Sequence, residues 1–405
     1  MTIHDESVLK SPNRILLWHF GKEGAGAKFT FEIGRALAQK QNQILNYVAA
    51  EQSDLANLLS RNNIEKADHI AIFRGDKRSL SGIFSAGLAF LKLPKIAYDF
   101  ERIIRRTKPD LLLCGFQSIW DLAALPILRR LKIPFILVLH DAEPHPGDDY
   151  PLRARALKWE VNAADGLIVL SDQVGRAASQ LYNFPPQRIH QIKHGRFDFG
   201  EAPKTARDYP TERPFRLLFL GRIVAYKGLP LLLSAYKRLL ALNPSLMLTI
   251  AGSGDLGPLK AAIEASPQIT LINEWLSDET ISSCLNAADA VVLPYVEASQ
   301  SGVAAAAFSA GLPIIATPVG GLTEQIDHEV NGLIARDVSA EAFADSIHTL
   351  VNAPDLYQSL SKNALFHANT ALNWNEIAED LGGIFDQIRS LPKRNQHARD
   401  LVEFD

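Results

Sequence analysis

Residues 216–254 read RLLFLGRIVAYKGLPLLLSAYKRLLALNPSLMLTIAGSG, and this stretch decides the fold. The apolar run Leu217–Leu220 predicts a buried strand, and Gly228–Leu242 predicts a helix. Leu246–Ala251 predicts a second strand, which ends in Gly252-Ser-Gly254. The order strand, helix, strand is typical of a parallel sheet that is covered by helices.

The same alternation of short apolar runs and helix-length segments continues on both sides of this unit. Further strands are predicted at Arg14–Phe20, Ile70–Phe73, Leu111–Cys114, Phe135–Leu139 and Gly166–Leu170, and then at Ile269–Ile272, Ala290–Leu293 and Pro313–Ala316. The polar, proline-bearing segment 198–214 separates the two sets and is typical of a linker. We predict an α/β protein of two Rossmann-like domains facing each other across a cleft. Ligands bind outside the carboxyl ends of parallel strands, and one linker between the domains should place those two edges opposite each other.

Composition restricts the class of protein. Hydrophobic residues make up 47% of the 405 residues and charged residues 21%, as in globular proteins. Two cysteines, Cys114 and Cys284, are too few for a disulfide scaffold and fit a reducing cytoplasm. The polar N-terminus lacks a signal peptide's apolar segment, and no run approaches the roughly 20 apolar residues that cross a bilayer. We expect a soluble cytoplasmic protein, at most peripheral to a membrane.

The charge is unevenly distributed along the chain. The net charge is −3, but residues 1–197 carry 27 Lys and Arg against 20 Asp and Glu, which leaves 15 against 25 for residues 198–405. Anionic partners would meet the basic N-terminal half first. An ordinary solvated surface would give the same count.

Two basic residues follow the strand that opens the second domain, in Gly221-Arg-Ile-Val-Ala-Tyr-Lys-Gly228. The glycines allow a tight turn, and Arg222 and Lys227 bring two positive charges to one strand end. A diphosphate leaving group needs such charges, because negative charge builds on it as a glycosidic bond breaks. The alternative is that both side chains are merely solvated. A lysine at a helix N-terminus opposes the helix dipole, which favours the binding role.

A second phosphate-binding candidate precedes the alanine-rich helix of the second domain. Ser299 or Ser301 can cap this helix, and free N–H groups of Ser301, Gly302 and Val303 would bind an anion. Glu297 lies just outside the helix start, where a carboxylate could bind sugar hydroxyls. The alternative is a plainly capped helix whose acidic neighbour favours its dipole.

The first domain offers a glycine-rich turn and a histidine at strand ends. Gly24 and Gly26 follow the first strand and would admit a ligand, although Phe29 stands where a dinucleotide fingerprint needs its third glycine. His140 and Asp141 follow the strand Phe135–Leu139. A histidine at this edge can meet a donor or acceptor hydroxyl, although such a histidine is also commonly structural.

The loop after His140 extends this candidate site. His145 lies in its acidic, proline-ordered continuation and is a further substrate-binding candidate. His194 precedes the linker and could line the hinge. Metal chemistry is not expected, because no two histidines share ligand spacing on a helix and the pair Asp148-Asp149 is adjacent in a loop. The sequence contains no Gly-x-Ser-x-Gly elbow, which argues against an α/β-hydrolase.

Taken together, these motifs resemble the retaining GT-B glycosyltransferases of glycosyltransferase family 4. The segments that carry the resemblance are GAGAKFTFEIGRAL, LVLHDAEPHPG, AADGLIVLS, GRIVAYKG, AGSG and AAFSAGLPIIATPVGGLTEQI. The resemblance implies a nucleotide-diphosphate-sugar donor on the second domain, with Arg222 and Lys227 on the diphosphate and Glu274 near the base. It also implies an acceptor site on the first domain, retention of anomeric configuration, and no metal or other cofactor.

The resemblance further implies that a final helix near Trp374–Ile388 crosses back to the first domain. The expected boundaries are 1–197 for the acceptor domain, 198–375 for the nucleotide-sugar domain, and 376–405 for the returning helix and tail.

One departure concerns a pair of glutamates that the family commonly carries with seven residues between them, the second of which holds the donor ribose. Alignment on the AGLP segment places Ala298 and Ala306 at these positions. Glu297 is one residue out of register with the first position, so the sequence leaves open whether it takes the role of that glutamate. It also leaves open that the chain is a catalytically inactive relative of the family.

The segment Lys77–Lys108 suggests where an acceptor would come from. Its apolar part, Leu80–Leu93, is flanked by basic residues, which suits an anionic membrane surface, although an ordinary core helix fits as well.

We expect a hexosyltransferase-type enzyme of cell-surface polysaccharide or glycolipid assembly, with a lipid-linked saccharide acceptor and no nucleic acid partner. His140, Arg222, Lys227 and Glu297 are its expected catalytic residues. The alternatives are a sugar-nucleotide epimerase, a non-catalytic sugar-nucleotide-binding partner of a transferase and, more distantly, an NAD-dependent dehydrogenase.

Overall fold

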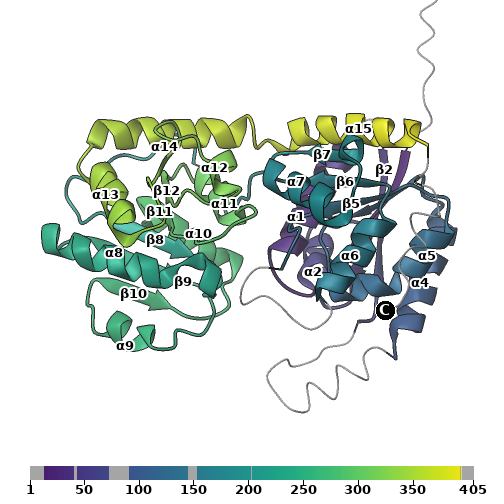
Figure 1. Ribbon diagram of the computed structural model, residues 1–405, viewed down its shortest axis with the longest axis horizontal. Coiled ribbons are helices and arrows are strands. Elements are labelled where there is room, and N and C mark those ends of the chain that lie inside the picture. Colours follow the sequence, from purple (N-terminus) through teal and green to yellow (C-terminus); the bar gives the residue numbers. More distant parts are fainter. Residues whose placement is uncertain are drawn as a thin grey trace, which may run out of the picture.

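The chain forms two lobes, each built on its own parallel sheet (Figure 1). The computed structural model describes residues 13–40, 43–72, 91–144, 153–201, 203–392 and 394. The elements of the first lobe are β1 (Asn13–His19), α1 (Ala25–Gln39), β2 (Gln43–Ala50), α2 (Asp54–Arg61), β3 (Ala67–Ile70), α4 (Leu93–Thr107), β4 (Leu111–Cys114), η1 (Ile119–Ala123), α5 (Leu125–Arg130), β5 (Phe135–Leu139), α6 (Arg153–Ala163), β6 (Gly166–Val169), α7 (Asp172–Tyr182), η2 (Pro186–Arg188) and β7 (Ile189–Gln191).

The second lobe repeats the plan and ends in two long helices. Its elements are β8 (Arg216–Leu220), η3 (Ala225–Lys227), α8 (Leu229–Leu242), β9 (Met247–Ala251), α9 (Leu259–Glu264), β10 (Ile269–Ile272), α10 (Asp278–Ala287), β11 (Ala290–Leu293), α11 (Gly302–Ser309), β12 (Ile314–Ala316), α12 (Leu322–Gln325), β13 (Gly332–Ile334), α13 (Ala340–Val351), α14 (Pro354–Asn369) and α15 (Trp374–Ser390).

The strand order places the loops that matter for function. The first sheet runs β3-β2-β1-β4-β5-β6-β7 and the second β10-β9-β8-β11-β12-β13, and the strand pairs are parallel. The order reverses between β1 and β4 in the first sheet and between β8 and β11 in the second. Such switch points open a crevice at the carboxyl ends of the strands. The predicted fold class, two Rossmann-like domains, is confirmed.

Burial on both faces explains four of the strands that the sequence predicts. The strands β4, β5, β6 and β11 are buried along their whole length and read as continuous apolar runs. Three strands, β2, β7 and β13, were not predicted, and β3 ends at Ile70 instead of beginning there. The predicted helix at Gly228 begins one residue later, because Gly228 itself is left-handed with φ of 70° and caps it.

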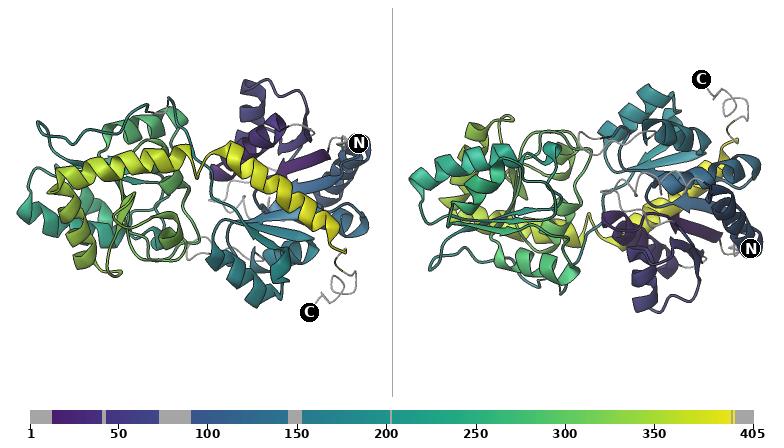
Figure 2. Two further views of the ribbon diagram at one scale, coloured as in Figure 1. Left: turned by 90° about the horizontal axis from the view of Figure 1, so that it is seen from above. Right: turned by 90° about the horizontal axis from the view of Figure 1, so that it is seen from below.

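The last helix returns to the first lobe, as predicted. In Figure 2, α14 lies along the second lobe and α15 continues across the first. The Trp374 indole N–H donates to the carbonyl of Arg196 at 2.8 Å, and the Arg389 guanidinium donates to the Asn13 side chain at 2.6 Å. The Lys40 ammonium and the Glu379 carboxylate lie 2.5 Å apart between α1 and α15. Among the described residues, no helix is both long and apolar enough to cross a membrane.

Candidate functional site

The loop after β8 brings a lysine to the switch point of the second sheet. The Lys227 ammonium donates to the Tyr295 hydroxyl at 2.6 Å and lies 3.8 Å from the centre of that ring. Tyr295 is fully buried, and burial raises its pKa, so the phenol stays neutral. Tyr295 therefore orients the Lys227 ammonium without neutralising it. Arg222, on the same loop, is exposed.

The same tyrosine connects this loop to the N-terminus of α11. The Tyr295 hydroxyl lies 3.3 Å from the Ser301 hydroxyl, and Ser301 Oγ caps α11 by accepting from the N–H of Ala304 at 3.4 Å. The N–H groups of Gly302 and Val303 occupy the first turn of α11, where helix geometry supplies no carbonyl acceptor. A phosphate at this point would meet both a lysine and the positive end of a helix.

One predicted donor group is not available for an anion. The N–H of Ser301 donates to the side-chain oxygen of Gln325 at 2.7 Å, and the Gln325 amide donates back to the Ser301 carbonyl at 3.4 Å. The expectation of a free N–H at Ser301 is therefore wrong. Gln325 is 24 positions away in sequence, and only the folded chain brings it here.

The acidic candidates lie on exposed parts of the second lobe. Glu297 and Glu274 are exposed, and Trp275, next to Glu274, is 54% exposed. Ala298 and Ala306, at the positions where the family commonly carries glutamates, are buried. The structure thus places small apolar side chains at both positions.

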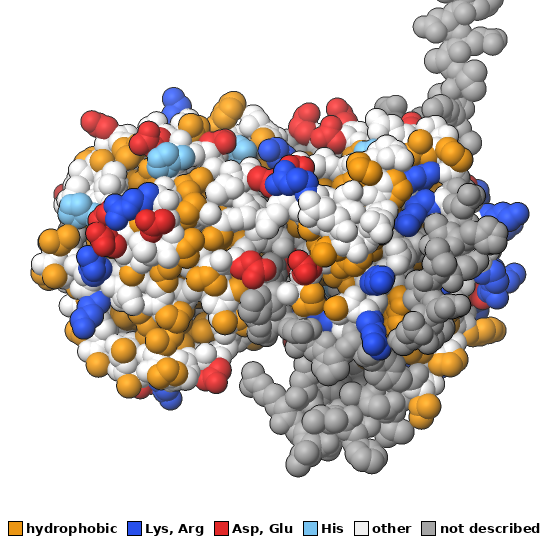
Figure 3. Space-filling view, in the orientation of Figure 1, with side chains coloured by type: hydrophobic (Ala, Val, Ile, Leu, Met, Phe, Trp, Pro, Cys, Tyr) orange, Lys and Arg blue, Asp and Glu red, His pale blue; other side chains and the backbone are white. Residues whose placement is uncertain are grey.

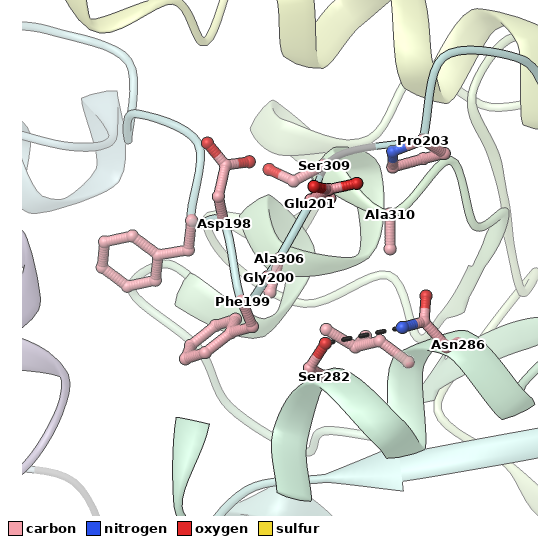
Figure 4. A pocket seen from close by; sticks show the side chains of 12 residues that line it. Asp198, Phe199, Gly200, Glu201, Pro203, Ser282, Asn286, Ala306, Ser309 and Ala310 are labelled. Atoms are coloured by element: carbon pink, nitrogen blue, oxygen red, sulfur yellow. Dashed lines mark hydrogen bonds between the residues drawn. The ribbon is translucent and has the colours of Figure 1, made fainter. Parts of the chain in front are cut away.

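Ala306 also lines a pocket between α10, α11 and the interdomain linker (Figure 4). The carboxylates of Asp198 and Glu201 reach this pocket from the linker. On its far side the Asn286 amide donates to the Ser282 hydroxyl at 3.4 Å. The lining beside Ala306 thus combines these polar groups with apolar side chains such as Phe199 and Leu285.

In the first lobe, the predicted glycines Gly24 and Gly26 allow the tight turn and the close packing between β1 and α1. Gly24 has φ of 107°, caps α1, and donates its N–H to the Asp54 carboxylate at 2.9 Å. A Cβ on Gly26 would lie 2.6 Å from the Phe116 ring, so this glycine makes room for an aromatic side chain. Gly24 is the one whose backbone needs the positive φ.

His140 lies at the end of β5, buried among aromatic rings. Its ring contacts Phe29 and Phe116 with centroids 4.7 and 4.0 Å apart, and its Nε2 lies 3.1 Å from the carbonyl oxygen of Gly115. Since a carbonyl can only accept, Nε2 carries the proton and Nδ1 presents a lone pair. Nδ1 has no hydrogen-bond partner within the described part of the chain.

The neighbours of His140 in sequence are placed differently. The Asp141 carboxylate lies 3.9 Å from the Arg153 guanidinium, which holds it toward α6. His145, the other predicted residue of this loop, lies outside the described residues.

His194 joins the two lobes more closely than the sequence indicates. A Cβ on Gly302 would lie 3.5 Å from His194 Nε2 and 3.2 Å from the Phe197 ring, so the start of α11 touches the hinge. The Lys28 ammonium, from α1, lies 3.3 Å from the Asp278 carboxylate of α10 and over the Phe199 ring. Neither contact has a sequence signal, because each joins elements of different domains.

Three buried histidines line this region, and we expect all of them to be neutral at pH 7. Burial lowers the pKa of His19, His140 and His194 to about 4 each. Because folding lowers these values, the stability that the neutral rings contribute is complete above pH 6.5 and is lost as the pH falls toward 4. Nitrogen NMR of the imidazoles should show the Nε2–H tautomer of His140 unchanged between pH 8 and about pH 5. A His140 titration centred near pH 6.5 would contradict the burial argument.

Residues 27–196 match the family described as "Glycosyltransferase Family 4", and residues 214–353 match "Glycosyl transferases group 1". The chain belongs to the family 4-like GT-B glycosyltransferases. The two matches fall on the two lobes, one on each.

Individual relatives of this glycosyltransferase are distant in sequence and similar in fold. An alpha-D-kanosaminyltransferase of Streptomyces kanamyceticus is 24% identical over 279 residues, which span 64% of this chain and 72% of the relative. The structure of a glycosyltransferase from Rickettsia africae superposes with a TM-score of 0.69 at 16% identity, covering 94% of this chain and 100% of that one. Anabaena HepE in complex with UDP-glucose superposes with a TM-score of 0.68 at 16% identity, covering 93% and 100%.

Proposed function

We propose that this glycosyltransferase moves a sugar from a nucleotide-diphosphate-sugar to a hydroxyl acceptor with retention of configuration. The observation that carries the proposal is the junction of Lys227, Tyr295 and Ser301, which brings a cation and a helix N-terminus to one strand edge. Both favour the negative charge that develops on a departing diphosphate. The HepE complex with UDP-glucose, on the same fold, is consistent with such a donor.

The reaction exchanges one bond at the anomeric carbon for another. The bond from the anomeric carbon to the diphosphate oxygen breaks, its electron pair leaves with the diphosphate, and the acceptor oxygen bonds to the same carbon while its proton passes to the departing diphosphate oxygen. In this proposal Lys227 and Arg222 stabilise the leaving group. His140, at the carboxyl end of β5, helps to orient the sugar in this proposal.

The donor class can be determined by thermal shift. A panel of UDP, GDP, ADP and dTDP sugars, run with and without EDTA, should contain one compound that clearly raises the melting temperature through binding to the native state. Because Arg222 and Lys227 carry the charge that a metal would otherwise supply, EDTA should leave this shift unchanged. Failure of all four classes to stabilise the chain would contradict the proposal. Anomeric NMR of the product would separate retention from inversion, and release of free nucleotide diphosphate only in the presence of an acceptor would exclude an epimerase.

We further propose that the acceptor is a lipid-linked saccharide reached at an anionic membrane surface, in polysaccharide or glycolipid assembly. Most of the apolar segment Leu80–Leu93 lies outside the described residues. The adjoining α4 carries Tyr98 with 67% exposure and the basic residues Lys95, Arg102, Arg105 and Arg106, and Figure 3 shows Lys and Arg side chains on both lobes. Several of these cations pair with carboxylates: Arg105 lies 2.7 Å from Glu101, and Lys95 lies 2.6 Å from Asp99.

Vesicle co-sedimentation tests this surface. We expect the chain to bind phosphatidylglycerol vesicles at low salt and to be released as the salt concentration rises, because exposed charges are screened. Replacing Arg102 and Arg105 by glutamate should lower the bound fraction several-fold, whereas Lys260→Glu on α9, also exposed, should not. Equal sedimentation with neutral vesicles, or none at low salt, would contradict the membrane proposal.

A further inference from the structure

The helix α12, which holds Glu324 and Gln325, connects the two lobes at one point. The Glu324 carboxylate accepts from the N–H of Asp172 at 2.6 Å and from the N–H of Gln173 at 3.0 Å. These two groups belong to the first turn of α7, in the other lobe. The next N–H of that turn, from Val174, is taken by its own cap, Ser171. The second lobe therefore completes the N-terminal cap of a helix in the first.

This contact is well matched in charge. The first N–H groups of a helix lack acceptors within the helix and form its positive end, where a carboxylate is favourable. The Gln191 amide adds a third hydrogen bond to Glu324 at 3.2 Å, also from the first lobe. If the lobes separated, Glu324 would lose all three partners together.

The next residue of α12 faces the proposed donor site. Gln325 holds the backbone of Ser301 on both sides, as described above, and Ser301 in turn caps α11 and lies beside the Tyr295 hydroxyl that Lys227 contacts. Two adjacent side chains of one short helix thus hold the other lobe and the donor loop.

The turn before α12 has no space to move independently of that loop. A Cβ on Gly320 would lie 2.0 Å from the carbonyl oxygen of Ala298, and one on Gly321 would lie 1.9 Å from that of Ser299. The backbones of the two segments are therefore in direct contact. A displacement of α12 would be passed to residues 298–301.

We propose that Glu324 and Gln325 are positioning residues that couple closure of the two lobes to the shape of the diphosphate site. Glu324 holds the lobes in the closed arrangement, and Gln325 fixes Ser301 for the start of α11 and for Tyr295. The part of the proposal that concerns nucleotide affinity rests on the proposed function, whereas the part that concerns lobe closure does not.

The coupling is tested by a distance measurement between the lobes. Spin labels at Ser60→Cys on α2 and Ala261→Cys on α9 occupy exposed positions, and the two native cysteines are buried. The doubly labelled protein without further substitutions should give one narrow distance distribution by double electron–electron resonance. Glu324→Gln keeps the size of the side chain but removes its charge, and should shift or broaden that distribution. Glu264→Gln, an exposed residue of α9, should leave it unchanged.

The second readout is the affinity for free UDP, or for whichever nucleoside diphosphate stabilises the chain most. Glu324→Gln should weaken it about tenfold or more, as expected when charged hydrogen bonds are lost. Gln325→Ala should weaken it similarly without changing the distance distribution. An unchanged distribution in Glu324→Gln, with a normal melting temperature, would overturn the coupling. Absence of nucleotide binding to the unmodified chain would instead contradict the proposed function, while the distance measurement would still decide whether Glu324 holds the two lobes together.

Discussion

Replacing Lys227 by alanine is expected to lower the rate of sugar transfer by about 10²–10³-fold, with most of the loss in kcat. The reason is that a preorganised positive group matters most where charge develops in the transition state, and loss of one such group costs about this factor. Arg222→Ala should have a comparable effect. Initial rates with the donor identified by thermal shift would measure both.

Removing the hydrogen-bond partner of Lys227 should lower the rate less than removing Lys227 itself. Tyr295→Phe keeps the ring under the ammonium but removes the hydroxyl that accepts its hydrogen bond at 2.6 Å. We therefore expect the rate to fall by only about tenfold. Lys237→Ala, on the exposed face of α8, is the matched control and should leave the rate unchanged. A Lys227→Ala variant within threefold of the unmodified rate would contradict the assigned role.

Gly228→Ala is expected to destabilise the fold by about 3 kcal/mol, as the sum of backbone strain and overpacking. Gly228 has φ of 70°, and a Cβ there would lie 1.8 Å from the carbonyl oxygen of Pro294. Because the obstacle is backbone rather than a movable side chain, the loop after β8 or the end of β11 would have to shift. Chemical denaturation would measure the loss.

Gly257→Ala separates the two causes. Gly257 also has a positive φ, of 48°, but a Cβ there would have nothing within 4 Å. We expect it to cost only about 1 kcal/mol, from the left-handed backbone alone. Equal losses in the two variants would show that the contact between Gly228 and Pro294 is unimportant.

The sequence predicts the strands that read as short apolar runs with clear boundaries, and it misses strands with polar residues or with too few residues to stand out. The run Leu217–Leu220 is apolar throughout and bounded by Arg216 and Gly221, so its assignment needs no tertiary information. The strand β2 contains Gln43 and Asn46, and its pairing with β1 is what makes it a strand. The strands β7 and β13 are three residues long, too short for a periodic signal.

For the site, the sequence predicts positions on strand ends but not contacts between segments. Arg222 and Lys227 could be placed at a strand end because the glycines and the preceding strand are local signals. The contact of Lys227 with Tyr295 spans 68 positions, and that of Glu324 with Asp172 spans 152. No local pattern encodes either contact. The error at Ser301 has the same origin, since its N–H is taken by a side chain of α12, the next helix along the chain.

The central claim is that Arg222 and Lys227 hold the diphosphate of the donor. A crystal structure of the chain with the nucleoside diphosphate that binds most tightly would test it directly. We predict phosphate oxygens within about 3 Å of the Lys227 ammonium and of the Arg222 guanidinium, beside the N–H groups of Gly302 and Val303. A diphosphate bound elsewhere, or either cation directed away from it, would contradict the claim.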